Sequence, residues 1–521
     1  MLQSLQDIVL VSLFFGISWL LLSLSQRWAK SKTRLSIPRI GLDPKVVGIE
    51  ACKQDFLING YKYVQEGYKK YKDSMYLVQT ADMERIVLSN KFVEELRVLP
   101  ESKLSTRFAM CERHLGHYTT LDVVLLSHLQ NDVCKVHLTQ NMPRLIPGLL
   151  DESGYAFEQQ LGDVTAESWT DKHGHTTILD CITHLASRAF VNKPLCRNPS
   201  WLETATGYTL DVFALAGVLR DRSWLIRPLL YLTSSARTKL HSRFKLANSL
   251  VGPILQSRMR EQQSDNDEKP ADLLQWLLEN AQGDDRSPER LIHKLLFICL
   301  ASIHTSTMSA CHALYDLCQY PEYAEPLRQE IKGAIREHGS LTYAAINNLR
   351  RLDSFIKESQ RINHPGSLSF NRKVLENIQL SDGTLLPKGS FITMPTAAIS
   401  MDPQYYPNPQ EFRPWRYFDL RSEKEENANR YQFTSTSASS LPFGHGKFAC
   451  PGRFFAAGQI KLLLAMIILH YDVKWPEGQV TRPQNVYIDE RIGPNRDQIV
   501  CFRQRKEEEL PLMIPNNIPS S

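Results

Sequence analysis

The sequence predicts a mainly α-helical protein with a minor β-rich region, preceded by a single transmembrane helix at its N-terminus. Three observations predict this class. Residues 8–24 are almost entirely apolar, as in a membrane-spanning helix. Apolar residues recur with helical spacing through many long segments. Runs with strand character are few and short.

The composition is that of an ordinary globular protein. Hydrophobic residues make up 42% of the 521 residues and charged residues 22%, which is enough for a large core. The net charge of +5 is small for this length, and no basic stripe with interleaved aromatic residues occurs. Nucleic acid is therefore not an expected partner. The ten cysteines are scattered without a Cys-x-x-Cys pair, which argues against a zinc or thioredoxin-like site.

The apolar N-terminal segment predicts a membrane anchor. Ile8–Leu24 would span about 26 Å as a helix, near the short limit for crossing a bilayer. Lys and Arg follow this segment between residues 27 and 34, and none precedes it. The positive-inside rule then leaves the N-terminus lumenal and the chain after Gln26 cytosolic. The alternative is a cleaved signal peptide, which normally carries its charge in front of the apolar stretch. We assign residues 1–36 to the anchor and its basic flank, and residues 511–521 to a polar tail.

The first half of the chain predicts helices with one short hairpin of strands. Pro100 ends the helix before it, and weak periodicity after it predicts a flexible loop. The elements in order are a helix over Asp55–Tyr71, strands over Met75–Gln79 and Arg85–Ser89, a helix over Asn90–Leu99, a loop over Glu101–Val124, and helices over Leu129–Met142, Ile178–Val191, Trp201–Leu219, Thr233–Gln263 and Asp272–Asn280.

An apolar run interrupts the long helices after residue 219. It fits membrane contact, and it fits the protein core equally well. Its members are Trp224, Leu225, Ile226, Leu229, Leu230 and Leu232.

The longest predicted helix begins at Ser287-Pro288-Glu289, which reads as an N-cap, a proline at the first helical position and an acid in the first turn. It could continue to Tyr320, where Pro321 stops it, a length of about 50 Å. Residues 295–301 are apolar on all faces, which indicates burial. A further helix is predicted over Leu352–Asn363. Short strands and turns are predicted over Val374–Leu380, around residues 386–389 and 399–402, and over Gln498–Arg503.

The stretch Leu441–Arg453 carries the strongest chemical signal. Gly444 and Gly446 permit a tight turn that a Cβ would obstruct, and Pro451 is suited to the first position of the apolar helix that follows. Cys450 should then lie at a helix N-terminus, which lowers a thiol's pKa. A thiolate in such a pocket is the electron-donating axial ligand that a haem iron needs. The alternative is a small core cysteine before an ordinary helix.

The pattern Phe443-Gly444-x-Gly446-x-x-x-Cys450-x-Gly452 resembles the cytochrome P450 family. In detail the chain is similar to fungal membrane-bound P450s of secondary metabolism, of the ent-kaurene-oxidase and indole-diterpene-oxidase kind. The resemblance covers nearly the whole sequence. It implies the cytochrome P450 fold over residues 37–510, haem b with Cys450 as the axial ligand of its iron, and Phe443, Gly444 and Gly452 around the cofactor.

The middle of the long helix supports this resemblance. Ala301-Ser302-Ile303-His304-Thr305 is similar to the family pattern Ala-Gly-x-acid-Thr. A small residue leaves room for dioxygen, and the Thr305 hydroxyl can bond back to the Ala301 carbonyl and steer protons. Ser302 replaces the glycine, and His304 replaces the acid. His304 could relay protons near neutral pH, or it could be a satisfied core histidine.

The resemblance also implies contacts behind and beside the haem. Glu358, Arg361 and Arg416 would form a buried ionic triad that fixes the geometry of the haem loop. Lys135 and Arg372 would bind the haem propionates, although Lys135 could equally be a surface lysine. Phe448 stands where the family usually carries Arg or His, so one charge-assisted contact is lost; the neighbouring Lys447 is a candidate substitute.

Further roles follow from the resemblance alone. Ser367, Leu368 and Phe370 are candidate substrate contacts, residues 101–124 form a lid, and residues 490–494 form a turn that points into the pocket. Electrons would come from NADPH through NADPH–cytochrome P450 reductase, with cytochrome b5 as a second candidate donor. No dinucleotide or flavin fingerprint occurs in the chain. The expected docking contacts for the reductase are Lys135, Arg453 and Lys461.

We therefore predict a monooxygenase of the endoplasmic reticulum membrane, single-pass, with its catalytic domain in the cytosol. It would insert oxygen into a small apolar substrate, a terpenoid or indole-diterpenoid scaffold of a fungal biosynthetic pathway. Two alternatives stay open. One is a P450-type isomerase, dehydratase or oxidative-coupling enzyme without net oxygen insertion. The other is a non-catalytic membrane haem binder.

Overall fold

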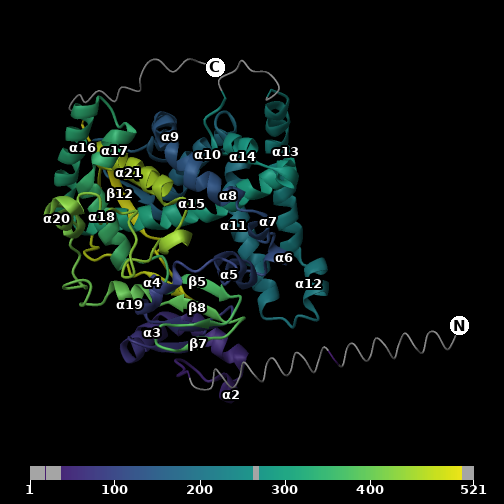
Figure 1. Cartoon of the computed structure of the whole chain (residues 1–521). Coiled ribbons are helices and arrows are strands. Elements are labelled where there is room, and N and C mark those ends of the chain that lie inside the picture. Colours follow the sequence, from purple (N-terminus) through teal and green to yellow (C-terminus); the bar gives the residue numbers. More distant parts are fainter. Residues whose placement is uncertain (1–17, 19–36, 262–268, 507–521) are drawn as a thin grey trace.

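The computed structural model of the chain describes residues 37–261 and 269–506, together with Ser18. Apart from Ser18, the predicted anchor and its basic flank lie outside the described residues, as does the tail 511–521. The described part is mainly helical with a smaller β-rich region, as predicted. In Figure 1 most helices occupy the upper part of the molecule, and the largest sheet lies below them beside α3.

Long helices form the body of the protein, and short ones connect them. The helices are α2 Pro44–Val47, α3 Ile49–Tyr71, α4 Val93–Leu96, α5 Thr106–Arg113, α6 Gly116–Thr119, α7 Val123–Leu126, α8 Leu129–Asp132, α9 Met142–Leu161, α10 Gly174–Val191, α11 Pro199–Arg220, α12 Arg227–Thr233, α13 Ser235–Glu261, α14 Leu273–Asn280, α15 Pro288–Gln319, α16 Ala324–His338, α17 Tyr343–Asn348, α18 Arg350–Ile362, α19 Thr396–Ser400, α20 Arg416–Ser422 and α21 Arg453–His470.

The strands form one larger sheet and three small ones. The five-stranded sheet has the order β1 Met75–Gln79, β2 Glu84–Leu88, β8 Phe391–Met394, β5 Ser369–Val374 and β3 Leu104–Ser105, and only β2 and β8 pair in parallel. The others are β4 Thr170–His173 with β12 Ile499–Gln504 and β9 Tyr471–Lys474, β10 Val486–Ile488 with β11 Arg491–Gly493, and β6 Ile378–Gln379 with β7 Leu385–Leu386.

The β1 strand shows why this hairpin forms. Met75 and Leu77 belong to one buried apolar cluster, and Tyr76 and Val78 belong to another. Successive side chains of a strand point to opposite faces, so β1 is covered on both sides. The predicted strand Met75–Gln79 is confirmed with the same bounds.

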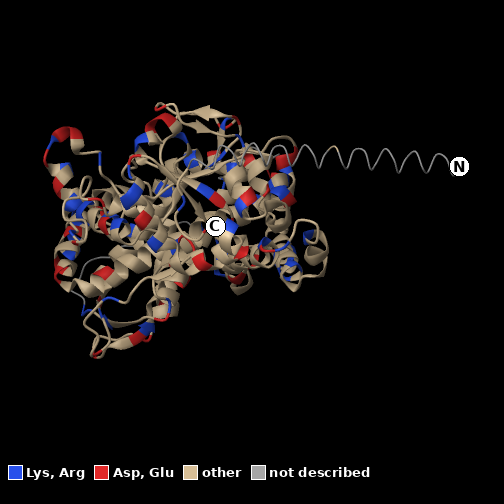
Figure 2. Ribbon diagram, turned by 90° about the horizontal axis from the view of Figure 1, so that it is seen from below, with Lys and Arg blue, Asp and Glu red and all other residues tan. Residues whose placement is uncertain are grey.

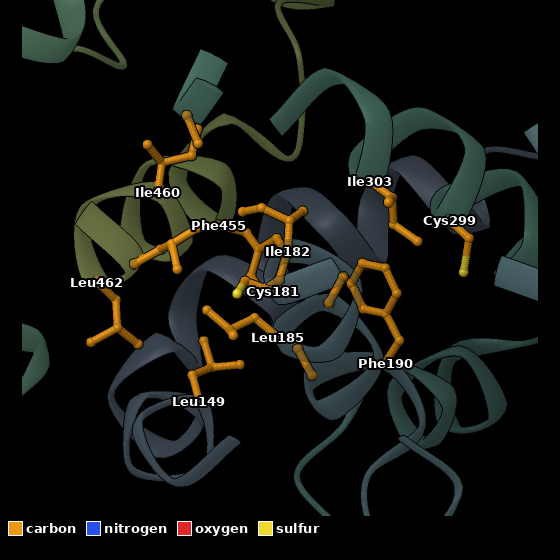
Figure 3. Packing of buried hydrophobic residues seen from close by; sticks show 14 of the residues in the cluster. Leu149, Cys181, Ile182, Leu185, Phe190, Cys299, Ile303, Phe455, Ile460 and Leu462 are labelled. Carbon is orange, nitrogen blue, oxygen red and sulfur yellow. The ribbon is translucent and has the colours of Figure 1, made fainter. Parts of the chain in front are cut away.

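The main core lies where α9, α10, α15 and α21 meet. Figure 3 shows Leu149, Cys181, Ile303 and other side chains of these helices in one packed cluster. The rings of Phe190 on α10 and Phe455 on α21 are 5.5 Å apart. Residues 295–300 are buried as predicted, whereas Ala301, the last residue of the predicted segment, is exposed. The buried residues fix α15 across the middle of the protein.

Two described helices are long and apolar enough to cross a membrane, namely α15 and α21. In each, most of the apolar window is buried inside the protein, 67% and 72% respectively. Both are therefore accounted for as core helices of the globular part.

The start of α15 follows the predicted signals. Ser287 is the N-cap, and its hydroxyl accepts a hydrogen bond from the Arg290 amide at 3.3 Å. Pro288 is the first helical residue. The helix ends at Gln319, directly before Tyr320 and Pro321, as expected.

The prediction of a flexible loop over residues 101–124 is wrong. This stretch contains β3, α5 and α6 and the start of α7. Ser105 caps α5 by accepting the Phe108 amide at 3.2 Å, and β3 pairs with β5. Distant pairing partners rather than local periodicity order the segment, which is why the sequence did not reveal it.

Residues 129–142 do not form one regular helix. The chain forms α8, then a π-helical turn over Val133–Leu138, and α9 starts at Met142. The Thr139 hydroxyl donates to the Cys134 carbonyl at 3.1 Å, five residues back. Residues 399–402 differ from the prediction in part, because α19 covers Ile399 and Ser400, while Met401 lies in a turn.

Candidate active site

The loop before α21 is held in a tight form by its own backbone. The Cys450 amide donates to the Phe443 carbonyl at 2.7 Å, and the Ala449 amide donates to the Gly446 carbonyl at 3.1 Å. Gly446 has φ +75°, and a Cβ there would lie 2.7 Å from the Cβ of Arg97. The positive φ of Gly446 and the close approach of Arg97 explain why glycine is needed at this turn, as predicted.

The helix after the loop starts later than predicted. Gly452 is its N-cap and Arg453 its first residue, so Pro451 precedes the helix. The residues beyond it, Phe454 to Ile468, are helical as expected. A Cβ added to Gly452 would meet no described atom within 4 Å, so space is left beside Cys450.

Cys450 is a half-buried residue, whereas the other nine cysteines are buried. Burial raises the pKa of Cys450, while hydrogen bonds from the Gly452 and Arg453 amides and the charge of Arg453 act in the opposite direction. The prediction that the helix N-terminus alone lowers the pKa of the Cys450 thiol is therefore wrong. A bound metal ion would supply the missing stabilisation, since a coordinating thiol is deprotonated outright.

The oxygen-side residues of α15 lie on an open face of a core helix. Ala301 and Thr305 are exposed, although Leu300 before the pair and Ser306 after it are buried. The Thr305 hydroxyl donates to the Ala301 carbonyl at 2.7 Å, which is the back-bond proposed from the sequence. Two residues four apart thus line one opening beside the helix axis.

His304 points elsewhere. Its Nε2 donates to the Thr206 carbonyl on α11 at 3.0 Å, and burial lowers its pKa. This is the arrangement of a satisfied core histidine. A proton relay through the other ring nitrogen stays a prediction.

Arg372 is a buried cation with a spare donor. Its side chain is 4% exposed. Its Nη1 donates to the Asn371 carbonyl at 2.9 Å, and its Nη2 has no hydrogen-bond partner among the residues described. Burial lowers its pKa to about 10, with Glu101 acting in the opposite direction. A carboxylate ligand would satisfy both the charge and the unpaired donor.

The backbone and two rings fix the direction of this cation. A β-bulge lies between Ser369 and Arg372, and Phe370 has φ +56°. Bulges commonly re-aim a side chain beside a functional site. The guanidinium of Arg372 lies 4.2 Å from the ring centre of Phe370 and 5.7 Å from that of Phe448. The sequence predicted only the loss of a charge-assisted contact at Phe448. In the structure the ring of Phe448 contacts the Arg372 cation.

Lys135 and Lys447 are both exposed. Lys135 is part of the π-helical turn, next to Cys134, whose pKa is raised to about 12 by burial and by Cys450. The electrostatic effect of Cys450 on the pKa of Cys134 indicates that the π-helical turn lies near Cys450. Lys447 lies over the Phe448 ring at 5.7 Å.

The three residues of the expected triad meet behind the loop. Glu358 accepts from Arg361 Nε and Nη2 at 2.8 Å each and from Arg416 Nε at 3.1 Å. All three side chains are at most 6% exposed. The same arginines bind the carbonyl oxygens of Ser400, Pro407 and Pro409.

Several candidates from the sequence do not reach an open face. Leu368 precedes β5 and is buried in one apolar cluster, and Phe370 on β5 is buried in another. The positive φ of +56° at Phe370 interrupts the regular alternation of the strand. Ser367 donates its amide to the Glu490 carbonyl at 2.6 Å. Lys461 is buried with Asp353 at 2.6 Å, so it is not a docking contact.

Two contacts that hold the loop had not been foreseen. His445 Nδ1 bonds with the Thr436 hydroxyl at 2.9 Å, and His445 Nε2 bonds with Glu94 at 3.2 Å. Glu94 lies on α4, 351 residues away in sequence. No local pattern could have revealed this pairing.

A cysteine loop of this form, together with a long core helix that carries an exposed Ala-Thr pair, is typical of a haem-thiolate protein. The family model described as Cytochrome P450 matches residues 186–489, which is more than half of the chain. The chain belongs to the cytochrome P450 family.

Curated relatives refine this assignment. Cytochrome P450 monooxygenase AN1598 of Emericella nidulans is 40% identical over 85% of this chain and 83% of its own length. Cytochrome P450 monooxygenase paxP of Penicillium paxilli is 36% identical over 85% of each chain. Ent-kaurene oxidase of Gibberella intermedia is 34% identical over 91% of this chain and 89% of its own. The chain is a cytochrome P450 monooxygenase, and the expected resemblance to fungal members is confirmed.

The residues present fit the haem-thiolate group that the family implies. Cys450 is half-buried, with open space beside Gly452. Arg372 offers an unpaired buried donor for a carboxylate. Ala301 and Thr305 offer an open helix face. These features are otherwise costly in a protein core, and a bound haem would account for all three.

We predict that Phe448 helps to keep Arg372 oriented for a haem carboxylate. Replacing it by Leu removes one cation–π contact, worth about 1 kcal/mol, so haem loss to excess apomyoglobin should be roughly fivefold faster. Phe448→Arg should slow haem loss, because it adds a charge-assisted contact.

Trp169→Leu is the matched control, since Trp169 stacks on Lys474 and Arg503 at 4.4 and 4.5 Å away from the loop. It should leave haem loss unchanged. Equal rates for Phe448→Leu and the wild type would contradict the role of Phe448.

Proposed function

We propose that this monooxygenase inserts one atom of dioxygen into an apolar terpenoid or indole-diterpenoid scaffold, with haem b bound through Cys450. The observation that carries the proposal is the Thr305 hydroxyl bonded to the Ala301 carbonyl at 2.7 Å on the exposed face of a buried helix. The substrate class is supported by the similarity to one relative, an ent-kaurene oxidase.

Haem iron with a thiolate ligand supplies the activation of dioxygen when it is bound. Cys450 would provide the thiolate, with Phe443, Gly444 and Gly452 around the ring. Arg372 would bind one propionate through its unpaired Nη2, and Lys135 is the candidate for the other.

Residues of α15 would deliver protons and leave room beside the helix for dioxygen. Ala301 leaves room beside the helix. Thr305 holds a proton at its Oγ1, and rotation about χ1 would redirect that proton from the helix carbonyl to the open face. His304 could supply protons through Nδ1, since its Nε2 is already engaged.

Electrons would come from NADPH through NADPH–cytochrome P450 reductase, with cytochrome b5 as a second candidate. Of the docking contacts expected, Lys135 is exposed and Arg453 half-buried, so both can take part in a protein contact. Acidic and basic residues are interspersed over the described chain in Figure 2, so docking would depend on local charges near Cys450.

The reaction without oxygen insertion and the non-catalytic haem binder are the competing functions. Both would leave the Thr305 hydroxyl without a chemical role. Replacing this hydroxyl therefore separates them from oxygen insertion.

We predict that the reduced carbon-monoxide difference spectrum of the full chain has a Soret band at the thiolate position. Cys450→Ser should abolish this band, because an alcohol at that position is not deprotonated as a thiol is. Haem content measured on the same samples is the control. A thiolate-type band that persists in Cys450→Ser would contradict the assignment of the ligand.

We predict that Thr305→Val lowers the amount of oxygenated product per NADPH by at least about tenfold. The measurement uses the purified enzyme with reductase and ¹⁸O₂, and it compares labelled product with hydrogen peroxide. Thr307→Val is the matched control, because the Thr307 hydroxyl bonds to the Ile303 carbonyl at 2.8 Å in the same way but is buried. If both variants lose product equally, the hydroxyl acts on helix structure and not on oxygen.

The chain also carries apolar surface that fits a membrane. Trp224, Leu225, Leu229 and Leu232 are 58 to 67% exposed, so the alternative that this run is core is wrong for them. On α2 and the start of α3, Val46 is 80% and Ile49 57% exposed. Figure 1 shows α2 and α12 at the lower edge of the molecule. We infer that this edge contacts the endoplasmic reticulum membrane, with residues 1–36 as a single-pass anchor and the catalytic domain in the cytosol.

We predict that Leu229→Ser combined with Leu232→Ser weakens flotation of a chain lacking residues 1–36 with phosphatidylcholine vesicles by about tenfold. A tenfold change corresponds to about 1.4 kcal/mol, which is the transfer free energy expected when the two leucines are inserted only in part, since full burial of one leucine is worth about 1.5–3 kcal/mol. Val480→Ser is the control, since Val480 is 80% exposed but lies outside this edge. Unchanged flotation of the double variant would contradict the assignment.

A further inference from the structure

A cavity lies where α16, the ends of α15 and α21, and the strands β9 and β12 meet. Its volume is about 350 Å³, which is within the range of ligand-binding pockets. It is open to solvent, because Pro321, Glu325 and Lys474 in its lining are exposed. Within the described chain, no residue of the candidate active site lines it. The cavity is therefore a second feature that calls for an occupant.

The buried part of the lining is apolar. Leu317 at the end of α15 is 3% exposed and Ile468 near the end of α21 is 2% exposed, and the half-buried Ala324 and Val473 lie beside them. An apolar cavity of about 150 Å³ holds a molecule the size of benzene. This cavity therefore has room for about two apolar side chains.

The rim of the cavity carries an excess of positive charge. Arg328, Arg503 and Arg505 all contact Asp472, with N–O distances of 3.5, 3.2 and 2.5 Å. Burial alone would raise the pKa of Asp472, but hydrogen bonds from Arg505 and Arg503 lower it. Glu325 contacts Arg328 as well. Three guanidinium groups thus share two carboxylates.

A fourth cation adds to this excess. Lys474 lies over the ring of Trp169 with its Nζ 4.4 Å from the ring centre, and Arg503 lies 4.5 Å from the same centre. No carboxylate of the described chain forms a salt bridge with Lys474. The rim therefore has a net charge that suits a segment with several acidic residues.

The described chain ends beside this cavity. The Arg505 amide donates to the His470 carbonyl at 2.8 Å, and Tyr471, the next residue after His470, lines the cavity. Residues 507–509 are three glutamates, and Leu, Leu, Met and Ile follow at positions 510, 512, 513 and 514. Residue 507 is at most about 7 Å along the chain from Arg505. Acidic residues thus reach the cationic rim first, and apolar residues follow them.

Two properties of this segment lower the cost of its binding. Pro511 and Pro515 restrict the backbone, so less conformational entropy is lost when the segment is ordered. The segment is also tethered to β12, and a short tether raises the effective concentration to the millimolar range. A weak intrinsic affinity is therefore sufficient for occupancy.

We propose that residues 507–514 of the same chain occupy this cavity. The three glutamates bind the cationic rim, and two of the apolar side chains pack against Leu317 and Ile468. The segment then joins α16 to the end of α21 and to β9, in addition to the contacts of Arg328. A second copy of the chain could present the same segment, so the experiment must separate the two sources.

The first test is carbodiimide cross-linking of the full-length holoenzyme at low ionic strength, with the products mapped by mass spectrometry. We expect amide bonds within one chain between residues 507–509 and either Lys474 or Lys332. Lys332 follows Arg328 by one turn on the same face of α16. Mixing ordinary with ¹⁵N-labelled protein distinguishes bonds within a chain from bonds between chains. Bonds only between chains, or none to these lysines, would overturn the proposal.

The second test is hydrogen exchange of full-length variants. Combining Glu507→Lys, Glu508→Lys and Glu509→Lys should accelerate exchange in residues 321–328 and 471–474 at least about fivefold, because the segment leaves the cavity. Combining Leu512→Ser with Ile514→Ser should act in the same direction, through loss of the apolar contacts.

Ser520→Lys combined with Ser521→Lys is the matched control. It adds positive charge to the same tail beyond the proposed contact, and it should leave exchange unchanged. Unchanged exchange in both variants of residues 507–514 would overturn the proposal. An equal acceleration in the control would overturn it too, because the effect would then depend on the total charge of the tail and not on a seated segment.

Discussion

The carboxylate of Glu358 is the interaction on which the placement of the cysteine loop depends. It is fully buried and accepts hydrogen bonds from Arg361, Arg416 and the Arg413 amide. The two guanidinium groups in turn bind backbone carbonyls between residues 400 and 411. This stretch has little regular structure, so side chains must satisfy its carbonyl groups. Without Glu358 the two cations would be buried and unpaired, which is more costly than losing the pair.

Several other buried cations of the protein are also paired with carboxylates, and Arg372 is an exception. Arg85, Arg258 and Lys461 each contact a carboxylate. Arg372 is equally buried, yet two phenyl rings and one carbonyl are its neighbours, and one of its nitrogens is unpaired. An unpaired buried donor is rare in native proteins. Arg372 therefore marks where a negatively charged group from outside the chain belongs.

Packing fixes the part of the site that lies on α15. The helix α15 is packed against α10, α11, α18 and α21, so the Ala301–Thr305 face is held in place. The segment with α5 is held by both apolar and polar contacts. Cys111 belongs to the main core, and Arg113 pairs with Glu490.

The sequence by itself determined what depends on neighbours along the chain. The glycine turn before Cys450, the capped start of α15 and the alternating strand β1 all follow from local residue preferences. The back-bond of Thr305 follows too, because it joins residues four apart in one helix.

Tertiary structure decided the rest. It ordered α5 through a cap and a strand partner, and it turned His304 toward α11. It also buried Leu368, Phe370 and Lys461, and it moved the start of α21 past Pro451. The strand pairing before α5, the direction of His304 and the burial of Lys461 depend on contacts between residues that lie far apart in the sequence. Such contacts leave no periodic signal, because burial and charge pairing are properties of the folded surroundings and not of the segment itself.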